Sequence, residues 1–290
     1  ADARGDRYTR DERASIRLNP ESVDLNLSEG EELYRKLVDG QLQTPDTWEV
    51  ELSQSTDKLK SWRRLLNEGK LGDLAFLRNL RNMVQVGITE AEIAEAGEGR
   101  RWGRVLPFRF VSAARVVPSL EPVLEHWMFR ALEGTPKLKG RTVLMVDVSG
   151  SMRSTLSAKS DLSRLDTAKA LAMLLRELCE SVSIYRFNES IVSIPPRRGF
   201  ALADAIGQAN GGTRLGAAVE LVRRRKDVDR LIVLTDEQAN DPVGTAPAAL
   251  SYMINVAAHQ YGVGTGDDWL RINGFSEAIV SYIQAWEAQV

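Results

Sequence analysis

The stretch that most constrains this chain runs from Thr142 to Met152 and reads TVLMVDVSGSM. It opens with apolar residues, 143–146, and carries no charge before Asp147. A short, continuous apolar run of this kind predicts a strand that is buried on both faces of a parallel sheet. The carboxylate of Asp147 and the hydroxyls of Ser149 and Ser151 follow at alternate positions. Because open α/β sheets bind ligands at the carboxyl ends of their strands, these oxygens predict a site for a hard divalent cation such as Mg²⁺.

Two later stretches carry matching oxygens. A glycine-rich loop places the hydroxyl of Thr213 before a helical run, and a second apolar strand, 231–235, ends in Asp236. Asp-x-Ser-x-Ser, then a loop threonine, then a strand-end aspartate resembles the metal-ion-dependent adhesion site of von Willebrand factor A domains. The resemblance covers Arg141–Val290 and implies a metal held by Asp147, Ser149, Ser151, Thr213 and Asp236. The simpler alternative is a turn whose Asp and Ser residues only cap the next helix.

This half of the chain alternates between short apolar runs and longer amphipathic ones. Strands are predicted at 142–147, 182–187, 191–194, 230–236 and 252–258. Helices are predicted at about 161–180, 202–209, 215–224 and 275–288. Strands that alternate with helices predict a doubly wound, Rossmann-like α/β domain with helices on both faces of the sheet.

The preceding half is helical in pattern. Apolar residues recur at helical spacing from residue 31 to about 134, and glycine or proline separates the runs. One such run, 74–84, predicts a single helix with Leu74, Leu77, Leu80 and Val84 on one face. The pattern predicts short helices stacked in pairs, in the manner of an α-solenoid.

The predicted organisation therefore has four parts. Residues 1–29 are polar and are expected to be extended or poorly ordered. Residues 30–134 form the helical repeats, 135–140 are a linker, and 141–290 form the α/β domain.

Positive charge is concentrated in part of the helical half. Residues 57–115 contain 12 basic and 7 acidic residues, whereas 1–56 contain 7 basic and 13 acidic ones. The planar guanidinium suits phosphate, so the arginines of this segment are candidate RNA contacts. They are Arg63, Arg64, Arg78, Arg81, Arg100, Arg101, Arg104, Arg109 and Arg115. Trp102, Phe108 and Phe110 lie among them and could stack on bases. The alternative is a solvated helical face with these aromatic rings in the core.

A second resemblance joins the two halves. The segments TWE at 47–49 and LRNLRNM at 77–83, then Pro107-Phe108, lead into the α/β domain through Gly140-Arg141. This arrangement resembles the carboxyl-terminal part of the TROVE family, in which HEAT-like repeats form a ring closed by an A domain. The resemblance implies a non-catalytic protein of RNA quality control or processing. It would bind small noncoding, Y-like RNA on basic outer surfaces and single-stranded ends of misfolded RNA in the hole, with an exoribonuclease as a candidate partner.

The helical half holds roughly 110 residues, fewer than the repeats of that family need for a ring. We therefore expect either a longer monomeric toroid or, if this is the full chain, a ring built from several copies.

Two other classes of function compete with RNA binding. A metal-dependent adhesion or scaffold module would capture an acidic side chain of a protein partner and would need no RNA. Enzymatic activity is not expected, because the only histidines, His126 and His259, lie away from the Asp147 motif, and the sequence has no P-loop or nucleophile elbow.

Composition excludes little else. A formal charge of −2 gives no global sign of nucleic-acid binding. The single cysteine, Cys179, follows a leucine-rich run, which predicts a buried thiol. The sequence has no 18-residue apolar stretch and no signal-peptide pattern, which predicts a cytoplasmic protein with no membrane partner.

Overall fold

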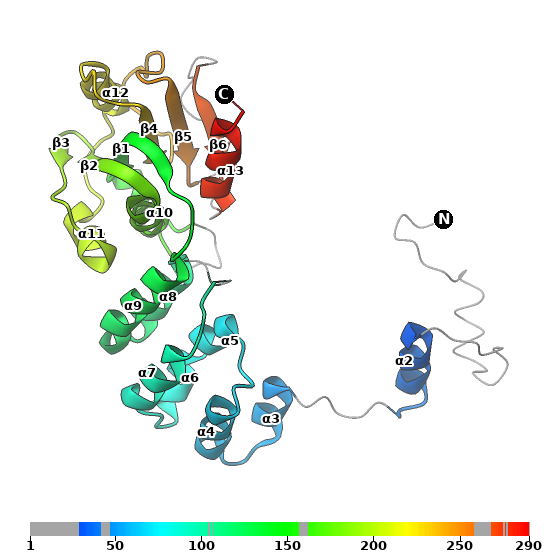
Figure 1. Cartoon of the computed structure of the whole chain (residues 1–290). Coiled ribbons are helices and arrows are strands. Elements are labelled where there is room, and N and C mark those ends of the chain that lie inside the picture. The colour runs from blue at the N-terminus through cyan, green and yellow to red at the C-terminus, as the bar shows by residue number, and fades with distance from the viewer. Residues whose placement is uncertain are drawn as a thin grey trace. The chain divides into compact units, whose positions relative to one another are not determined.

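The computed structural model of the chain describes residues 29–41, 47–103, 105, 107–156, 162–257, 268–274, 276 and 278–289 (Figure 1). Residues 1–28, which hold nearly all of the predicted polar segment, and Arg104 lie outside the described residues. The chain forms two compact units, which divide between Ser61 and Trp62.

In the described part of the first unit lie the helices α2 (Glu29–Val38) and α3 (Trp48–Gln54). Thr47 begins α3 as its N-cap, and its hydroxyl accepts a hydrogen bond from the N–H of Val50. Helix α4 (Lys58–Asn67) spans the division between the two units.

A six-stranded sheet forms the α/β part of the second unit, residues 138–289. Its strands are β1 (Leu138–Asp147), β2 (Cys179–Phe187), β3 (Ile191–Ser193), β4 (Arg230–Thr235), β5 (Leu250–Asn255) and β6 (Leu270–Asn273). Their order is β3-β2-β1-β4-β5-β6, and all neighbours are parallel except the antiparallel pair β2 and β3. The predicted doubly wound fold is confirmed. The sequence did not predict β6, a four-residue edge strand whose side chains are only partly buried.

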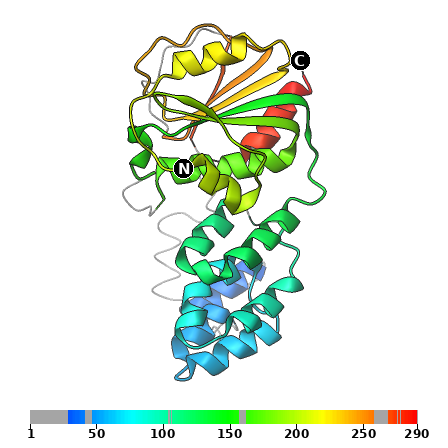
Figure 2. The same ribbon diagram turned by 90° about the vertical axis from the view of Figure 1, so that its left-hand side faces the viewer.

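Helices cover both faces of this sheet, with α12 (Leu215–Arg223) on one and α10 (Arg164–Leu178) and α13 (Ala278–Glu287) on the other (Figure 2). Val143 and Met145 pack with α12 in one core cluster. The alternate residues of β1, Leu144 and Val146, are equally buried. Because the central strand is covered on both sides, its sequence is continuously apolar.

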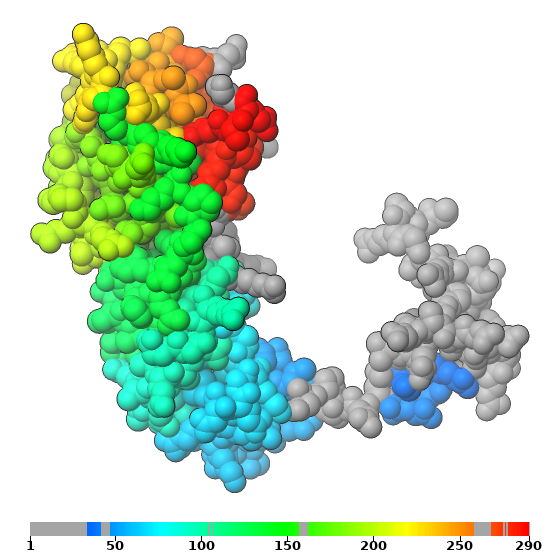
Figure 3. Space-filling model, in the orientation of Figure 1, coloured from blue at the N-terminus to red at the C-terminus, as the bar shows by residue number. Residues whose placement is uncertain are grey.

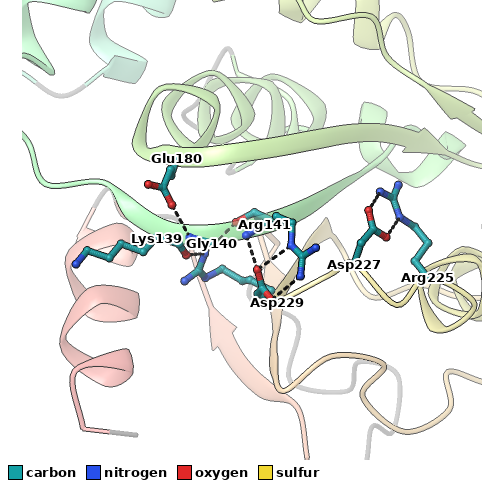
Figure 4. A network of polar contacts seen from close by, with 9 residues as sticks. Lys139, Gly140, Arg141, Glu180, Arg225, Asp227 and Asp229 are labelled. Atoms are coloured by element: carbon teal, nitrogen blue, oxygen red, sulfur yellow. Dashed lines mark hydrogen bonds and ion pairs between the residues drawn. The ribbon is translucent and has the colours of Figure 1, made fainter.

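Strand β1 begins earlier than predicted, so the predicted linker 135–140 overlaps it. Gly140 has φ 85° and its N–H donates to a Glu180 carboxylate oxygen at 2.9 Å. The backbone N–H of Arg141 donates to Asp229 at 2.7 Å, and its guanidinium contacts the same carboxylate at 3.2 and 3.3 Å (Figure 4). The register of β1 shifts between Leu138 and Arg141, which explains why the periodicity of the sequence conceals these residues.

The helical part of the second unit consists of short elements. They are α5 (Asp73–Arg78), α6 (Leu80–Gln85), α7 (Glu90–Glu98), α8 (Pro107–Val116), the 3₁₀ turn η2 (Pro118–Leu120) and α9 (Glu121–Ala131). The prediction of one helix over 74–84 was wrong. Asn79 separates α5 from α6, and its side-chain amide donates to the carbonyl of Ala75 at 2.8 Å, a local bond that competes with the helix. As a result Leu74 and Val84 are exposed.

An aromatic cluster forms the core of this helical part. Trp102 stacks on Trp127 with ring centroids 4.9 Å apart, and Phe76 and Phe110 meet Trp102 edge-on. Gly97 lies against Trp127 so closely that an added Cβ would be 1.8 Å from its ring. Trp102 and Phe110 are fully buried and so unavailable for base stacking, in agreement with the alternative that these rings form the core.

The helical part packs directly on the α/β part, with α8 against α10 and α9 against α11 (Gly199–Ile206). The Phe200 N–H, in the first turn of α11, donates to the Glu125 carboxylate of α9 at 2.7 Å. Arg198 pairs with Glu177 of α10 and lies over the ring of Phe129, 4.6 Å from its centroid. In the space-filling view the surface of α8 and α9 continues without a break into the α/β part (Figure 3).

Cys179 is a buried free thiol, as predicted. Among the described helices, none has the length and apolar character needed to cross a membrane.

Candidate metal centre and arginine surface

Asp147 lies at the carboxyl end of the central strand and is fully buried. Val146 pairs with Leu234 in the parallel ladder of β1 and β4, so Asp147 lies beside Thr235. The Thr235 hydroxyl donates to one carboxylate oxygen of Asp147 at 2.6 Å, and the N–H of Ser149 donates to the other at 2.8 Å. Burial raises the pKa of Asp147 to about 6, and the charge of Asp236 adds to the effect.

The turn after β1 is joined to the glycine-rich loop by backbone hydrogen bonds. The N–H of Gly150 donates to the carbonyl of Gly211 at 2.9 Å. A Cβ on Gly150 would lie 3.2 Å from that oxygen, so a glycine suits the close approach of the two loops. Ser149 and Ser151 bring their hydroxyl oxygens within 3.2 Å of each other.

Thr213, in the glycine-rich loop, and Asp236, after β4, supply the remaining two of the five predicted oxygen donors. Thr213 is buried, and its carbonyl accepts a hydrogen bond from the N–H of Asn240, in the loop after β4. Asp236 follows the last residue of β4 and is fully buried. The structure therefore brings the five predicted residues to adjoining loops at one end of the sheet. The strand order places the ends of β1 and β4 side by side, and backbone hydrogen bonds hold the loop of Thr213 against the loops that follow them.

The sequence analysis missed Arg164, the first residue of α10. Its guanidinium Nη1 donates to Asp236 Oδ2 at 2.7 Å, and its side chain is only 14% exposed. The helix dipole disfavours cations at helix N-termini. A basic residue at the start of α10 was therefore the one feature of the sequence that could have indicated a nearby carboxylate.

The donor set fits a hard divalent cation. It consists of two carboxylates and three hydroxyls, all oxygen ligands of the kind that Mg²⁺ prefers. The positive charge of Arg164 offsets one of the two buried carboxylates and leaves a formal charge of −1. Within the described ranges, no three His, Cys, Asp or Glu side chains cluster in a way that could hold a metal, so the hydroxyls are needed to complete the site.

The candidate RNA-binding arginines fall into two groups by their contacts. The first group is held by acidic residues of the protein. Arg63 pairs with Glu92 at 2.7 Å, and Arg115 pairs with Asp166 of α10. Arg100 is the most deeply held, and its side chain is 11% exposed.

Arg100 has a structural role that the sequence analysis did not foresee. Its guanidinium donates to Asp73 at 3.0 Å and to the carbonyl of Leu71 at 2.8 Å, and it lies 4.3 Å from the ring centroid of Phe76. A guanidinium that binds a phosphate would have to weaken these contacts. Arg100 is therefore the least favourable of the candidate contacts.

The second group faces solvent. Arg78, Arg81 and Arg101 are exposed, and among the described residues the structure gives them no ion pair or hydrogen bond from the side chain. Arg64 is also exposed, whereas Arg109 is half-buried and lies over the ring of Phe108. Arg78 and Arg81 lie on two different helices, α5 and α6, and not on one helix as predicted.

A family match to known proteins covers the helical part of the chain and does not extend to the candidate metal centre. Residues 39–127 match the TROVE domain. The chain is also 35% identical over 89 residues to telomerase protein component 1 of Mus musculus and, equally, of Rattus norvegicus. These matches cover 29% of this chain and only 3% of either relative.

A solved structure matches almost the whole chain. The Ro (RSR) protein of Deinococcus radiodurans superposes with a TM-score of 0.60 at 18% identity, over 97% of this chain and 74% of that protein. At this identity the likeness shows the fold. The predicted TROVE resemblance is thus confirmed in the helical half. The TROVE segment holds all the candidate arginines, and the candidate metal centre lies outside it.

Proposed function

We propose that this chain is a non-catalytic RNA-binding protein of the Ro type. It binds small noncoding, Y-like RNA, and the single-stranded ends of misfolded RNA, through its TROVE segment. Three exposed arginines without intramolecular partners in the described part of the chain, Arg78, Arg81 and Arg101, carry the proposal. The match of residues 39–127 to the TROVE domain and the Ro-like fold support it.

The physical argument concerns the cost of recruiting each arginine. An arginine that already pairs with a buried acid must break that pair before it can bind a phosphate. Arg78, Arg81 and Arg101 have no such pair to break with any residue that the structure describes. Each can therefore donate to phosphate oxygens, releasing counterions from the RNA, and the binding is expected to weaken steeply as salt rises.

The α/β part would serve as a metal-dependent docking module. Mg²⁺ prefers octahedral coordination and retains waters, so a site built from two carboxylates and three hydroxyls leaves a position for an acidic group of a partner. An exoribonuclease that processes the bound RNA is the partner class that we propose for this face.

The test compares two triple variants by binding of a hairpin RNA with a single-stranded 3′ tail at several salt concentrations. Arg78→Ala/Arg81→Ala/Arg101→Ala removes the proposed contacts. Arg197→Ala/Arg224→Ala/Lys226→Ala, a matched control, removes the same charge from exposed positions of the α/β part. We expect weaker binding only in the first variant, with a salt slope smaller by about 2 because each contact to single-stranded RNA contributes about 0.7.

Two results would count against the proposal. Equal losses in both triple variants would indicate that only net charge matters. No RNA binding by the wild-type protein, together with EDTA-sensitive capture of an acidic protein partner, would favour the alternative adhesion or scaffold module.

A further inference from the structure

The ion pair between Arg164 and Asp236 joins the first turn of α10 to the end of β4. The two side chains are 72 positions apart in the sequence, and Asp236 is fully buried. Asp236 is also one of the five oxygen donors proposed for the metal. A guanidinium therefore already occupies an oxygen of the group that the metal would use.

The other buried carboxylate of the centre has no such partner. Within the described part of the chain, Asp147 accepts hydrogen bonds from neutral groups of Thr235 and Ser149, namely the Thr235 hydroxyl and the Ser149 N–H and side chain. The two carboxylates thus differ in the metal-free protein, because one is neutralised by a cation of the chain and the other is stabilised by dipoles alone. A divalent cation would add positive charge where Arg164 already supplies some, and like charges in a buried site repel strongly.

We propose that Arg164 is an intrinsic counter-cation of the metal centre, a positioning residue that competes with the metal for Asp236. In the metal-free protein the guanidinium holds Asp236 in place and stabilises the end of the sheet. When a divalent cation binds, the guanidinium leaves Asp236 Oδ2 and turns away. This inference rests on the proposed metal centre, and it assigns to Arg164 the role of lowering the affinity for metal.

The position of Arg164 gives its displacement a second consequence. Ser163 is the N-cap of α10, and Asp166 completes the capping box from the same turn. Asp166 also pairs with Arg115 of α8, in the helical part of the unit. Arg164 thus lies two residues from Asp166, which makes one of the contacts between the TROVE segment and the α/β part. Displacement of Arg164 by metal is expected to destabilise the first turn of α10. Because Asp166 lies in that turn, the environment of Arg115 should change as well.

The first experiment measures Mg²⁺ and Mn²⁺ binding by calorimetry for the full chain and for three variants. Arg164→Met removes the charge and keeps an apolar stem, and Arg164→Lys keeps the charge. Arg176→Met, a matched control, removes a charge from the far end of the same helix. We expect Arg164→Met to bind metal about tenfold more tightly and to melt at a lower temperature without metal. Arg164→Lys and Arg176→Met should bind metal as the wild type does.

The outcomes separate this inference from the metal centre itself. Metal binding by the wild type with no gain in Arg164→Met would overturn the counter-cation role and leave the metal centre standing. No metal binding by either protein would overturn both.

A second measurement needs no variant and guards against misfolding of Arg164→Met. In nitrogen-15 NMR spectra of the wild type, the guanidinium protons of Arg164 should exchange slowly without metal because they are held by a buried carboxylate. Saturation with Mg²⁺ should speed their exchange and shift the side-chain signals of Arg115. A guanidinium signal of Arg164 that is unchanged at saturating Mg²⁺ would overturn the proposal.

Discussion

The carboxyl end of the sheet and the arginine-rich TROVE segment use their charged residues in opposite ways. At the sheet end, residues separated by up to 89 positions are brought to one buried cluster, and the five predicted donors lie on adjoining loops. In the TROVE segment, residues that are close in sequence have different fates. Arg100 is held inside the protein, and its neighbour Arg101 is exposed.

The difference arises from the kind of structure that places each set. Parallel strands in register end at the same edge, so the residues that follow them must meet. The side chain of a helical arginine is long and can reach several partners, and its fate depends on which acid or carbonyl lies within reach. Strand ends can thus be predicted as a group, whereas helical arginines have to be judged one at a time.

The largest effect is expected where packing in the helical part leaves no space. Gly97→Ala places a methyl group against Trp127, whose indole N–H is fixed by a hydrogen bond to Glu98 at 3.2 Å. We expect a loss of about 3 kcal/mol in the free energy of unfolding, measured in urea. Gly99→Ala is the control, because nothing lies within 4 Å of its added Cβ. Equal stability of the two variants would show that the aromatic cluster does not fix the helices that carry the arginines.

The next effect tests whether the sheet-end cluster binds metal as a group. Asp147→Asn keeps the shape of the side chain and removes its charge. We expect the affinity for Mg²⁺ to fall about 100-fold, or about 2.7 kcal/mol, with the fold retained. Calorimetry measures the affinity, and circular dichroism checks the fold. The same affinity in a folded variant would remove Asp147 from the proposed ligands.

A smaller effect sharpens the contrast between the neighbouring arginines. Arg100→Ala leaves Asp73 and the carbonyl of Leu71 without their donor, and we expect it to cost about 2 kcal/mol of stability. Arg101→Ala should change stability by less than about 0.5 kcal/mol. RNA affinity, measured well below the melting temperature of both variants, should show the opposite order. Arg101→Ala should weaken binding more than Arg100→Ala does. Thermal unfolding and filter binding of both variants test the pair.

The smallest effect concerns pH. The folded-state pKa of Asp147 is raised, so its contribution to the stability of the metal-free protein is present at low pH and is lost as pH rises through about 6. Binding of Mg²⁺ needs the ionised carboxylate, so the metal affinity should fall below about pH 6, by at most about tenfold per pH unit. Calorimetry between pH 5 and 7 measures this fall. A Mg²⁺ affinity that is constant over this range would contradict the raised pKa.

The sequence alone determined the α/β fold and the members of the candidate metal centre. The apolar run before Asp147 and the one before Asp236 each specify a strand buried on both faces, because only such strands can be apolar at every position. Since Asp147 and Asp236 come directly after these strands, the topology of a parallel sheet predicts that they meet at one edge. The TROVE segment was also identified from short sequence matches.

Only the tertiary structure decided which charges are already paired. Arg164 meets Asp236 across 72 positions, and Arg100 meets Asp73 across 27. Neither pair follows a local period, because each depends on how a helix is placed against another element. The break at Asn79 and the early start of β1 at Leu138 were missed for a related reason. At Asn79 a side-chain hydrogen bond interrupts the helical periodicity, and at the start of β1 a register shift interrupts the strand pattern.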